Sequence, residues 1–190
     1  MIQFPDSDIA SLVSSDATRI FLQRVTRLDL PENELILSPG QQQQHLYFIK
    51  KGVVRSYYKA FDNEWTNWFA AEGNPAFSTE NFLDENPSTE FIETCTPVNF
   101  YVISKQDFQQ LLKEFPELYQ LAFVFMYRYL RVAENRMYGL HVLTAYERYE
   151  RFIETHKNIV NRVKMQHIAS YLGITPTHLS RVRKEYAGKG

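Results

Sequence analysis

The sequence predicts an α+β protein with an N-terminal antiparallel β-roll, one long helix and a C-terminal helix-turn-helix. Short β-type runs between turns fill its first half, a heptad pattern follows, and two short helices around a glycine turn come last. We place these three parts at residues 1–115, 116–143 and 144–190.

Four runs rich in β-branched and aromatic residues predict strands of the roll, at residues 46–49, 53–58, 65–69 and 99–103. Turn signals separate them at short intervals, at residues 38–40, 51–52, 61–63 and 72–75. Gly40, Gly52 and Gly73 permit the positive φ that closing a strand pair demands. This pattern is typical of a sandwich, a jelly roll or a barrel. The apolar spacing of residues 9–28 predicts a small helix packed on the roll.

A long helix is predicted from about Pro116, which ends a shorter helix before it, to about Val142. One of its faces repeats apolar residues over three heptads: Tyr119, Phe123, Met126, Leu130, Ala133, Met137 and Leu140. A second face is also apolar: Leu118, Leu121, Ala122, Phe125, Tyr129 and Val132. One face can pack on the chain's own roll, and a homodimer through the heptad face is the simplest way to bury the other. The alternative is a core helix buried on all sides.

The C-terminal pair of helices is predicted at residues 165–172 and 176–186, on either side of a turn that contains Gly173. Thr175 is a suitable N-cap for the second helix, and Leu179 and Val182 anchor that helix inward. Its outward side offers hydroxyl, imidazole and guanidinium groups, which suit the major groove of DNA. The candidate DNA-binding residues are Lys164, Gln166, Thr175, Thr177, His178, Ser180, Arg181, Arg183 and Lys184. A plain packing motif with the same core remains the alternative.

The charge of the chain is unevenly distributed, although its net charge is only −1. Residues 151–190 hold eight Lys and Arg against two Glu, a net +6, so residues 1–150 carry −7. A basic C-terminal part predicts an anionic partner, with double-stranded DNA the first candidate.

Other classes of protein fit the sequence poorly. The single cysteine, Cys95, is too few for a disulfide framework or a four-thiolate cluster. The five histidines include no closely spaced pair, so we expect no metal site, no cofactor and no enzymatic activity. The first residues lack the features of a signal peptide, and no stretch approaches the ~20 apolar residues of a membrane span. We therefore expect a cytoplasmic protein without a membrane partner.

Three segments resemble the Crp/Fnr family of bacterial transcription regulators, named for the cyclic-AMP receptor and the fumarate–nitrate regulator. LSPG at residues 37–40 and LYFIKKGVVR at 46–55 resemble the opening of the cyclic-nucleotide-binding roll, and FYVISKQDF at 100–108 resembles its last strand and next helix. QHIASYLGITPTHLSRV at 166–182 resembles the family's helix-turn-helix. The resemblance implies a double-stranded β-helix roll and a homodimer with two recognition helices in successive major grooves. It also allows RNA polymerase as a further partner.

The sequence departs from this family where cyclic AMP would bind. Family members that bind it use a Gly-Glu pair and, about ten residues on, an Arg that neutralises the phosphate. Here residues 76–92 contain no Lys or Arg and several acidic residues, so we expect no useful affinity for cyclic AMP. The corresponding effector-binding candidates are Phe77, Glu80, Ser88 and Thr89. The effector, if there is one, is unknown from the sequence.

Two further expectations concern the C-terminal part. Family members usually continue from the recognition helix into a β-hairpin wing, whereas Tyr186 is followed by only four residues here. We therefore expect the wing's contacts to be absent or supplied by other residues. The alternative function is a regulatory module that binds a small molecule or a protein and has no DNA role, which a mobility shift with promoter DNA would distinguish.

Overall fold

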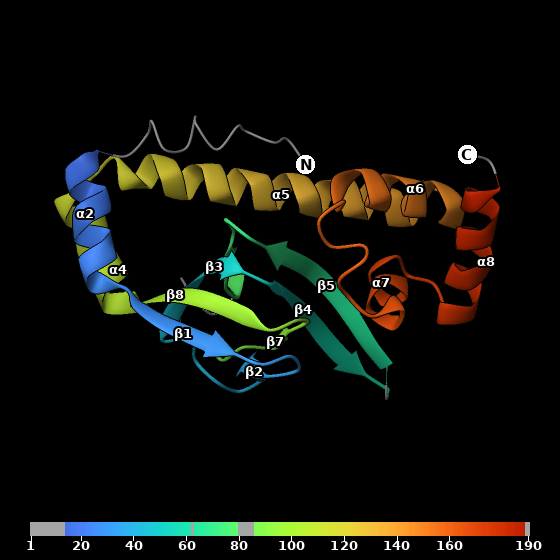
Figure 1. Cartoon of the computed structure of the whole chain (residues 1–190), viewed down its shortest axis with the longest axis horizontal. Coiled ribbons are helices and arrows are strands. Elements are labelled where there is room, and N and C mark those ends of the chain that lie inside the picture. The colour runs from blue at the N-terminus through green and yellow to red at the C-terminus, as the bar shows by residue number, and fades with distance from the viewer. Residues whose placement is uncertain (1–13, 62, 80–85, 189–190) are drawn as a thin grey trace.

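The computed structural model describes residues 14–61, 63–79 and 86–188, and it confirms the predicted fold class. Helix α5 (Leu118–Val142) runs along the molecule with the β-roll beneath it (Figure 1). Helices α2 (Ser15–Arg24) and α4 (Lys105–Glu114) lie at one end of α5. Helices α6 (Ala145–Thr155), α7 (Met165–Tyr171) and α8 (Pro176–Ala187) lie at the other end. None of the described helices combines the length and hydropathy that a membrane span needs.

The roll consists of two four-stranded sheets whose strand pairs are all antiparallel. The first has the order β1 (Thr26–Leu30), β8 (Val98–Ser104), β3 (His45–Lys51) and β6 (Pro75–Ala76). The second has the order β2 (Leu35–Leu37), β7 (Phe91–Thr94), β4 (Val53–Ala60) and β5 (Asn63–Ala71). Alternate residues of each strand face inward, and Ile49, Val54, Ile92 and Phe100 belong to the buried cluster between the sheets.

Gly52 shows why the turn between β3 and β4 needs glycine. Its φ is +115°, and a Cβ atom there would lie 2.7 Å from the carbonyl oxygen of Pro97. Any other residue at this position would therefore have a strained backbone conformation, and its Cβ atom would clash with the backbone of Pro97. The positive φ expected at Gly40 and Gly73 is also present.

The two apolar faces of α5 have different environments. Leu118 and Leu121 pack into a cluster with α2 and α4, and Tyr129 packs against the interior cluster of the roll. Every residue of the heptad face is exposed in the single chain, with Phe123 70% and Leu130 54% exposed. The helix is therefore not buried on all sides, and the heptad face leaves an exposed apolar stripe, of which the last residue, Leu140, contacts the turn before α8.

Cap chemistry sets the ends of the C-terminal helices. Thr144 and Glu147 form a capping box at the start of α6, and the Thr175 hydroxyl accepts a hydrogen bond from the His178 amide at the start of α8. Gly173 has a φ of +67° in the turn between α7 and α8. A Cβ atom on Gly173 would lie 2.9 Å from Leu140 Cδ2, so the turn packs directly against the end of α5. The predicted helix-turn-helix is present with nearly the predicted bounds.

Candidate nucleic-acid interface

Helix α8 presents one buried and one exposed face. Leu179 and Val182 are buried and share a core with Ile168, Ala169 and Leu172. The opposite face is exposed and polar, and it carries Thr177, His178, Arg181, Arg183 and Lys184. Ser180, which we expected on this face, is half-buried, because it follows Leu179 at the edge of the packed side.

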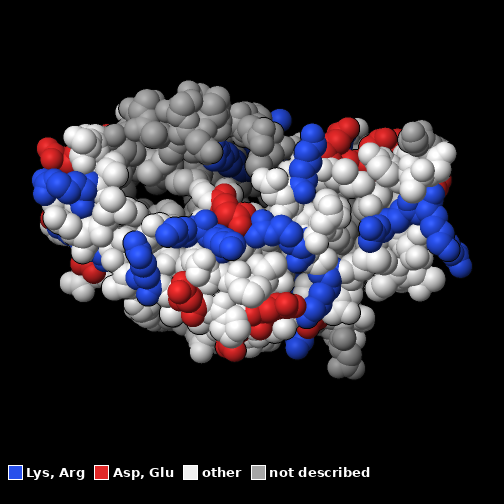
Figure 2. Space-filling model, viewed as in Figure 1, with Lys and Arg blue, Asp and Glu red and all other residues white. Residues whose placement is uncertain are grey.

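The cations of α8 are available to a partner. None of Arg181, Arg183 and Lys184 forms an ion pair with the described residues. Lys and Arg side chains project from the end of the molecule where α8 lies (Figure 2). An exposed helix with unneutralised cations is a favourable surface for the phosphates and base edges of DNA.

The other three candidate residues have different surroundings. Gln166 is exposed on α7. The Thr175 hydroxyl is used as a helix cap. Lys164 is turned toward the roll, where its Nζ lies 2.6 Å from Asn33 Oδ1 and 3.3 Å from a Glu32 carboxylate oxygen. The structure thus groups the candidates of α8 on one surface and places Lys164 at a different contact.

Helix α7 is docked on the free edge of strand β5. The Ser170 hydroxyl accepts a hydrogen bond from the Thr66 amide at 2.6 Å and donates one to the Glu64 carbonyl at 2.7 Å. Arg136 of α5 donates to the carbonyls of Thr66 at 2.9 Å and Tyr171 at 3.3 Å. These bonds satisfy an edge strand that would otherwise be open, and they join the helix-turn-helix to the roll and to α5.

Charged residues surround this contact. Arg162 forms two hydrogen bonds to the Glu72 carboxylate, which lower the pKa of Glu72 to about 2. Beneath α7, Arg55 is buried and pairs with Glu64 and Glu93. Sequence reasoning did not identify Ser170, Arg136 or Arg55. Arg55 is the one arginine in an otherwise largely apolar β run, and this position was the available signal. A cation that is buried in a sheet needs acidic partners nearby.

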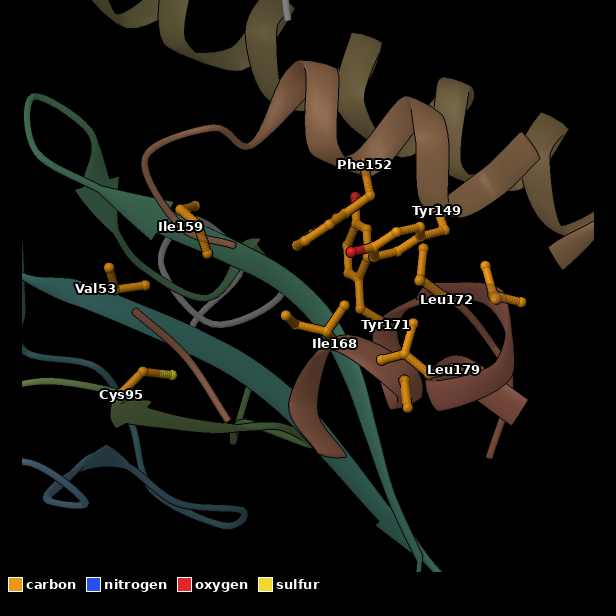
Figure 3. Close-up of a cluster of buried hydrophobic side chains, with 11 residues drawn as sticks. Val53, Cys95, Tyr149, Phe152, Ile159, Ile168, Tyr171, Leu172 and Leu179 are labelled. Atoms are coloured by element: carbon orange, nitrogen blue, oxygen red, sulfur yellow. The ribbon is translucent and has the colours of Figure 1, made fainter. Parts of the chain in front are cut away.

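One hydrophobic core extends across the contact. Tyr149 and Phe152 of α6 point toward Tyr171 and Leu172 at the end of α7, and Val53 and Cys95 of the roll belong to the same buried cluster (Figure 3). Burial raises the pKa of the Cys95 thiol to about 12, so this thiol is a packing group. Residues 144–190 therefore share their core with the roll.

Two histidines of this core should make its stability depend on pH. Burial lowers the pKa of His156 and of His167 to about 4, whereas an unfolded histidine has a pKa of about 6.5. Between these two pKa values the unfolded chain binds protons that the folded chain does not bind. The folded state therefore loses stability as the pH falls from about 6.5 toward 4. Between pH 7.5 and pH 5, we expect the free energy of unfolding to decrease by about 2 kcal/mol for each histidine.

Urea denaturation at several pH values measures this effect. The His167→Gln variant should lose about half of the histidine-dependent decrease, and the His178→Gln variant, changed at an exposed histidine of α8, should keep all of it. A pH profile identical in the wild type and in His167→Gln would contradict the assignment.

The three effector-binding candidates that lie in the described part of the chain have different surroundings. Phe77 packs into the cluster of α2 and α4, Thr89 is exposed, and Ser88 is buried with its hydroxyl bonded to the Glu90 carbonyl. Glu80 lies outside the described residues. The Glu90 carboxylate is buried and accepts a hydrogen bond from the Ser56 hydroxyl. A buried carboxylate so close to the Ser88 position disfavours a bound phosphate there.

A cavity of about 210 Å³ lies instead between strand β5 and helix α5. Trp68 and Asn67 line it from the strand, and Tyr129, Arg136 and His141 line it from the helix. Met137 and Leu140 of the heptad face also line it, so its outer rim belongs to the surface that we expect in a dimer. Sequence reasoning did not place a site at this position.

Comparison with known domains assigns the class of the roll. Residues 27–115 match the family model of the cyclic nucleotide-binding domain, which spans the roll from β1 through α4. No curated protein sequence matches the chain.

Solved structures share the fold over all three parts of the chain. FixK2 from Bradyrhizobium japonicum is similar with a TM-score of 0.76 and 19% identity, over 87% of this chain and 86% of that one. CLP of Xanthomonas campestris, a global regulator responsive to c-di-GMP, has a TM-score of 0.74 and 18% identity over 93% of each chain. A protein from Eubacterium rectale that is assigned to the Crp/Fnr family of transcriptional regulators has a TM-score of 0.73 and 12% identity, over 96% of this chain and 87% of that one. The second and third of these neighbours are described as regulators of gene expression, and the likeness at such identities is one of fold.

Proposed function

We propose that this protein is a transcription regulator of the Crp/Fnr type that binds double-stranded DNA as a homodimer. The observation that carries the proposal is the exposed face of α8, where Thr177, His178 and Arg181 project over the buried anchors Leu179 and Val182. A helix held in this way can enter the major groove, and its arginine can bind guanine through two hydrogen bonds.

The proposed dimer forms through the heptad face of α5. Its apolar side chains are exposed in the single chain, and burying them against a second copy removes a contiguous apolar surface from water. A two-fold axis along this helix would pair two α8 helices, which matches binding to a near-palindromic DNA site.

The proposed regulator does not use cyclic AMP as its effector. Glu90 and Ser56 are buried and hydrogen-bonded to each other, and Arg55, the buried cation next to Ser56, is already paired with two carboxylates, those of Glu64 and Glu93. Calorimetric titration of the full chain with cyclic AMP should give no heat of binding, and micromolar or tighter affinity would contradict this part of the proposal.

Arg181→Ala tests the recognition helix. A duplex selected from a random-sequence library by the wild type serves as the specific site, and an unrelated duplex serves as the non-specific one. Because a bidentate arginine–guanine contact contributes about 1–3 kcal/mol, we expect Arg181→Ala to weaken specific binding by about 10- to 100-fold for each half-site and to relax base preference at one position of each half-site. Fluorescence anisotropy measures both affinities.

Two other variants give the controls. Arg19→Ala changes an exposed arginine of α2, at the opposite end of the molecule, and should leave both affinities unchanged (Figure 1). Lys184→Ala should weaken binding to both duplexes by the same factor and make the salt dependence of binding shallower, since we propose that Lys184 contacts a backbone phosphate. If Arg181→Ala retained wild-type affinity and site choice, α8 would not be the reading element. If the wild type selected no duplex at all, the module without a DNA role would be the better description.

A further inference from the structure

A second cavity lies between the end of α5 and helix α6, and the end of α7 also contributes to its lining. Its volume is about 80 Å³, and its lining comes from the last turns of α5, the inner side of α6 and the end of α7. Three arginines line it: Arg136 of α5, and Arg148 and Arg151 of α6. Three cations therefore line the cavity beside apolar side chains such as Leu143 and Phe152, and the cavity lies where the proposed dimer helix meets α6 and α7.

The three arginines have no anionic partner. Within the described part of the chain none of them forms an ion pair, and no described residue that lines the cavity is acidic. The Thr144 hydrogen bonds that hold Glu147 in the capping box lower the pKa of its carboxyl. The charge of Arg151 lowers that pKa further, by a smaller amount and without an ion pair.

Each guanidinium is held by neutral groups and keeps unused donors. Arg148 donates to the Leu143 carbonyl at 2.6 Å, and its Nε is buried without a hydrogen-bond partner. Arg136 bonds two carbonyls and lies 5.1 Å from the Tyr171 ring centre. Arg151 lies 5.4 Å from the Tyr138 ring centre. Burial lowers the pKa of Arg136, which reflects the cost of holding this cation away from water.

Three like charges around one small cavity repel each other, and an anion between them would reverse that repulsion. Guanidinium groups match phosphate geometry because they donate two parallel hydrogen bonds. The volume also limits the ligand. At about 30 Å³ for each water, 80 Å³ holds two or three waters, and sites for drug-sized molecules need about 300–1,000 Å³.

We propose that this cavity binds a small tetrahedral oxyanion, either inorganic phosphate or the phosphoryl group of a larger molecule, through Arg136, Arg148 and Arg151. Such an anion would connect α5 to α6 directly and would fix the angle at which the helix-turn-helix domain leaves the dimer helix. The inference does not rest on DNA binding, and its test uses no DNA, so its failure and that of the proposed function are distinguishable.

The test measures binding of inorganic phosphate to the full chain by calorimetry, with chloride buffers of equal ionic strength as the reference. We expect specific binding by the wild type and at least a tenfold weaker affinity in Arg151→Gln and in Arg148→Gln. Arg151 is exposed, so its replacement should leave the fold intact even if Arg148→Gln, which loses the bond to Leu143, is unstable. The matched control is Arg27→Gln, an exposed arginine of strand β1 outside the cavity and outside the proposed DNA-binding surface, which should bind phosphate like the wild type.

Adenosine monophosphate distinguishes the two sources of the phosphoryl group. If this nucleotide binds and phosphate does not, and Arg151→Gln abolishes the binding, the site takes a phosphoryl group from a larger molecule. The proposal is overturned if neither compound binds the folded wild type. It is also overturned if Arg151→Gln and Arg148→Gln both bind phosphate as tightly as Arg27→Gln does, because the anion would then lie outside the cavity.

Discussion

Replacing Arg55 by alanine should destabilise the protein by about 3–5 kcal/mol, the largest stability change that we expect from one substitution. The side chain is 2% exposed, its Nε donates to Glu93 at 2.7 Å, and its terminal nitrogens bond Glu64 and Thr66. It also stacks on Tyr57, 4.1 Å from the ring centre. Removing it leaves the Glu93 carboxylate without its cation and leaves Glu64 with only Lys59, whose Nζ lies 3.8 Å away.

Urea denaturation monitored by circular dichroism measures this loss. Arg27→Ala, at an exposed position of strand β1, is the matched control and should change the free energy of unfolding by less than about 0.5 kcal/mol. The double variant Arg55→Met with Glu93→Gln should recover part of the loss, because it removes a charge from each side of the pair and keeps most of the volume. A loss below about 1 kcal/mol in Arg55→Ala would show that water or a rearranged neighbour compensates the carboxylates.

Placing glutamates at Phe123 and Leu130 should convert the proposed dimer into a folded monomer. Both side chains are exposed in the single chain, so the substitutions should hardly affect its folding. Across a two-fold axis, however, four carboxylates would meet in an apolar seam. We expect the affinity for a two-half-site duplex to fall by about 100-fold or more, because linked binding of two recognition helices contributes about 10²–10⁴ in affinity.

Size-exclusion chromatography with light scattering measures the mass, and anisotropy measures the DNA affinity. The control variant, Gln106→Glu with Gln109→Glu, adds the same charge on exposed positions of α4 and should stay dimeric. If the variant with Phe123→Glu and Leu130→Glu remained a dimer, the dimer interface would have to lie elsewhere on the protein. A monomeric wild type would contradict the proposed assembly altogether.

The sequence by itself determined the local elements and their faces. The 4-3 spacing on α5 separated an exposed stripe, including Phe123, from an inner stripe, including Leu118, because helical periodicity depends only on neighbouring turns. Thr175 and Gly173 marked the start of α8 and the turn before it for the same reason, since caps and positive-φ turns are made by residues close along the chain. The direction of α8's polar face followed from the positions of Leu179 and Val182.

Only the tertiary structure decided how the helix-turn-helix domain is attached. Ser170 meets Glu64 and Thr66 across more than 100 residues of sequence, and no local pattern records that distance. The same holds for Lys164, whose charge was consistent with a phosphate contact but whose ammonium lies beside Glu32. The three arginines that line the cavity between α5 and α6 come from two helices, and the sequence does not record which of their residues meet there. Periodicity tells which face of a helix is apolar, whereas the partner of each polar side chain depends on which distant elements pack beside it.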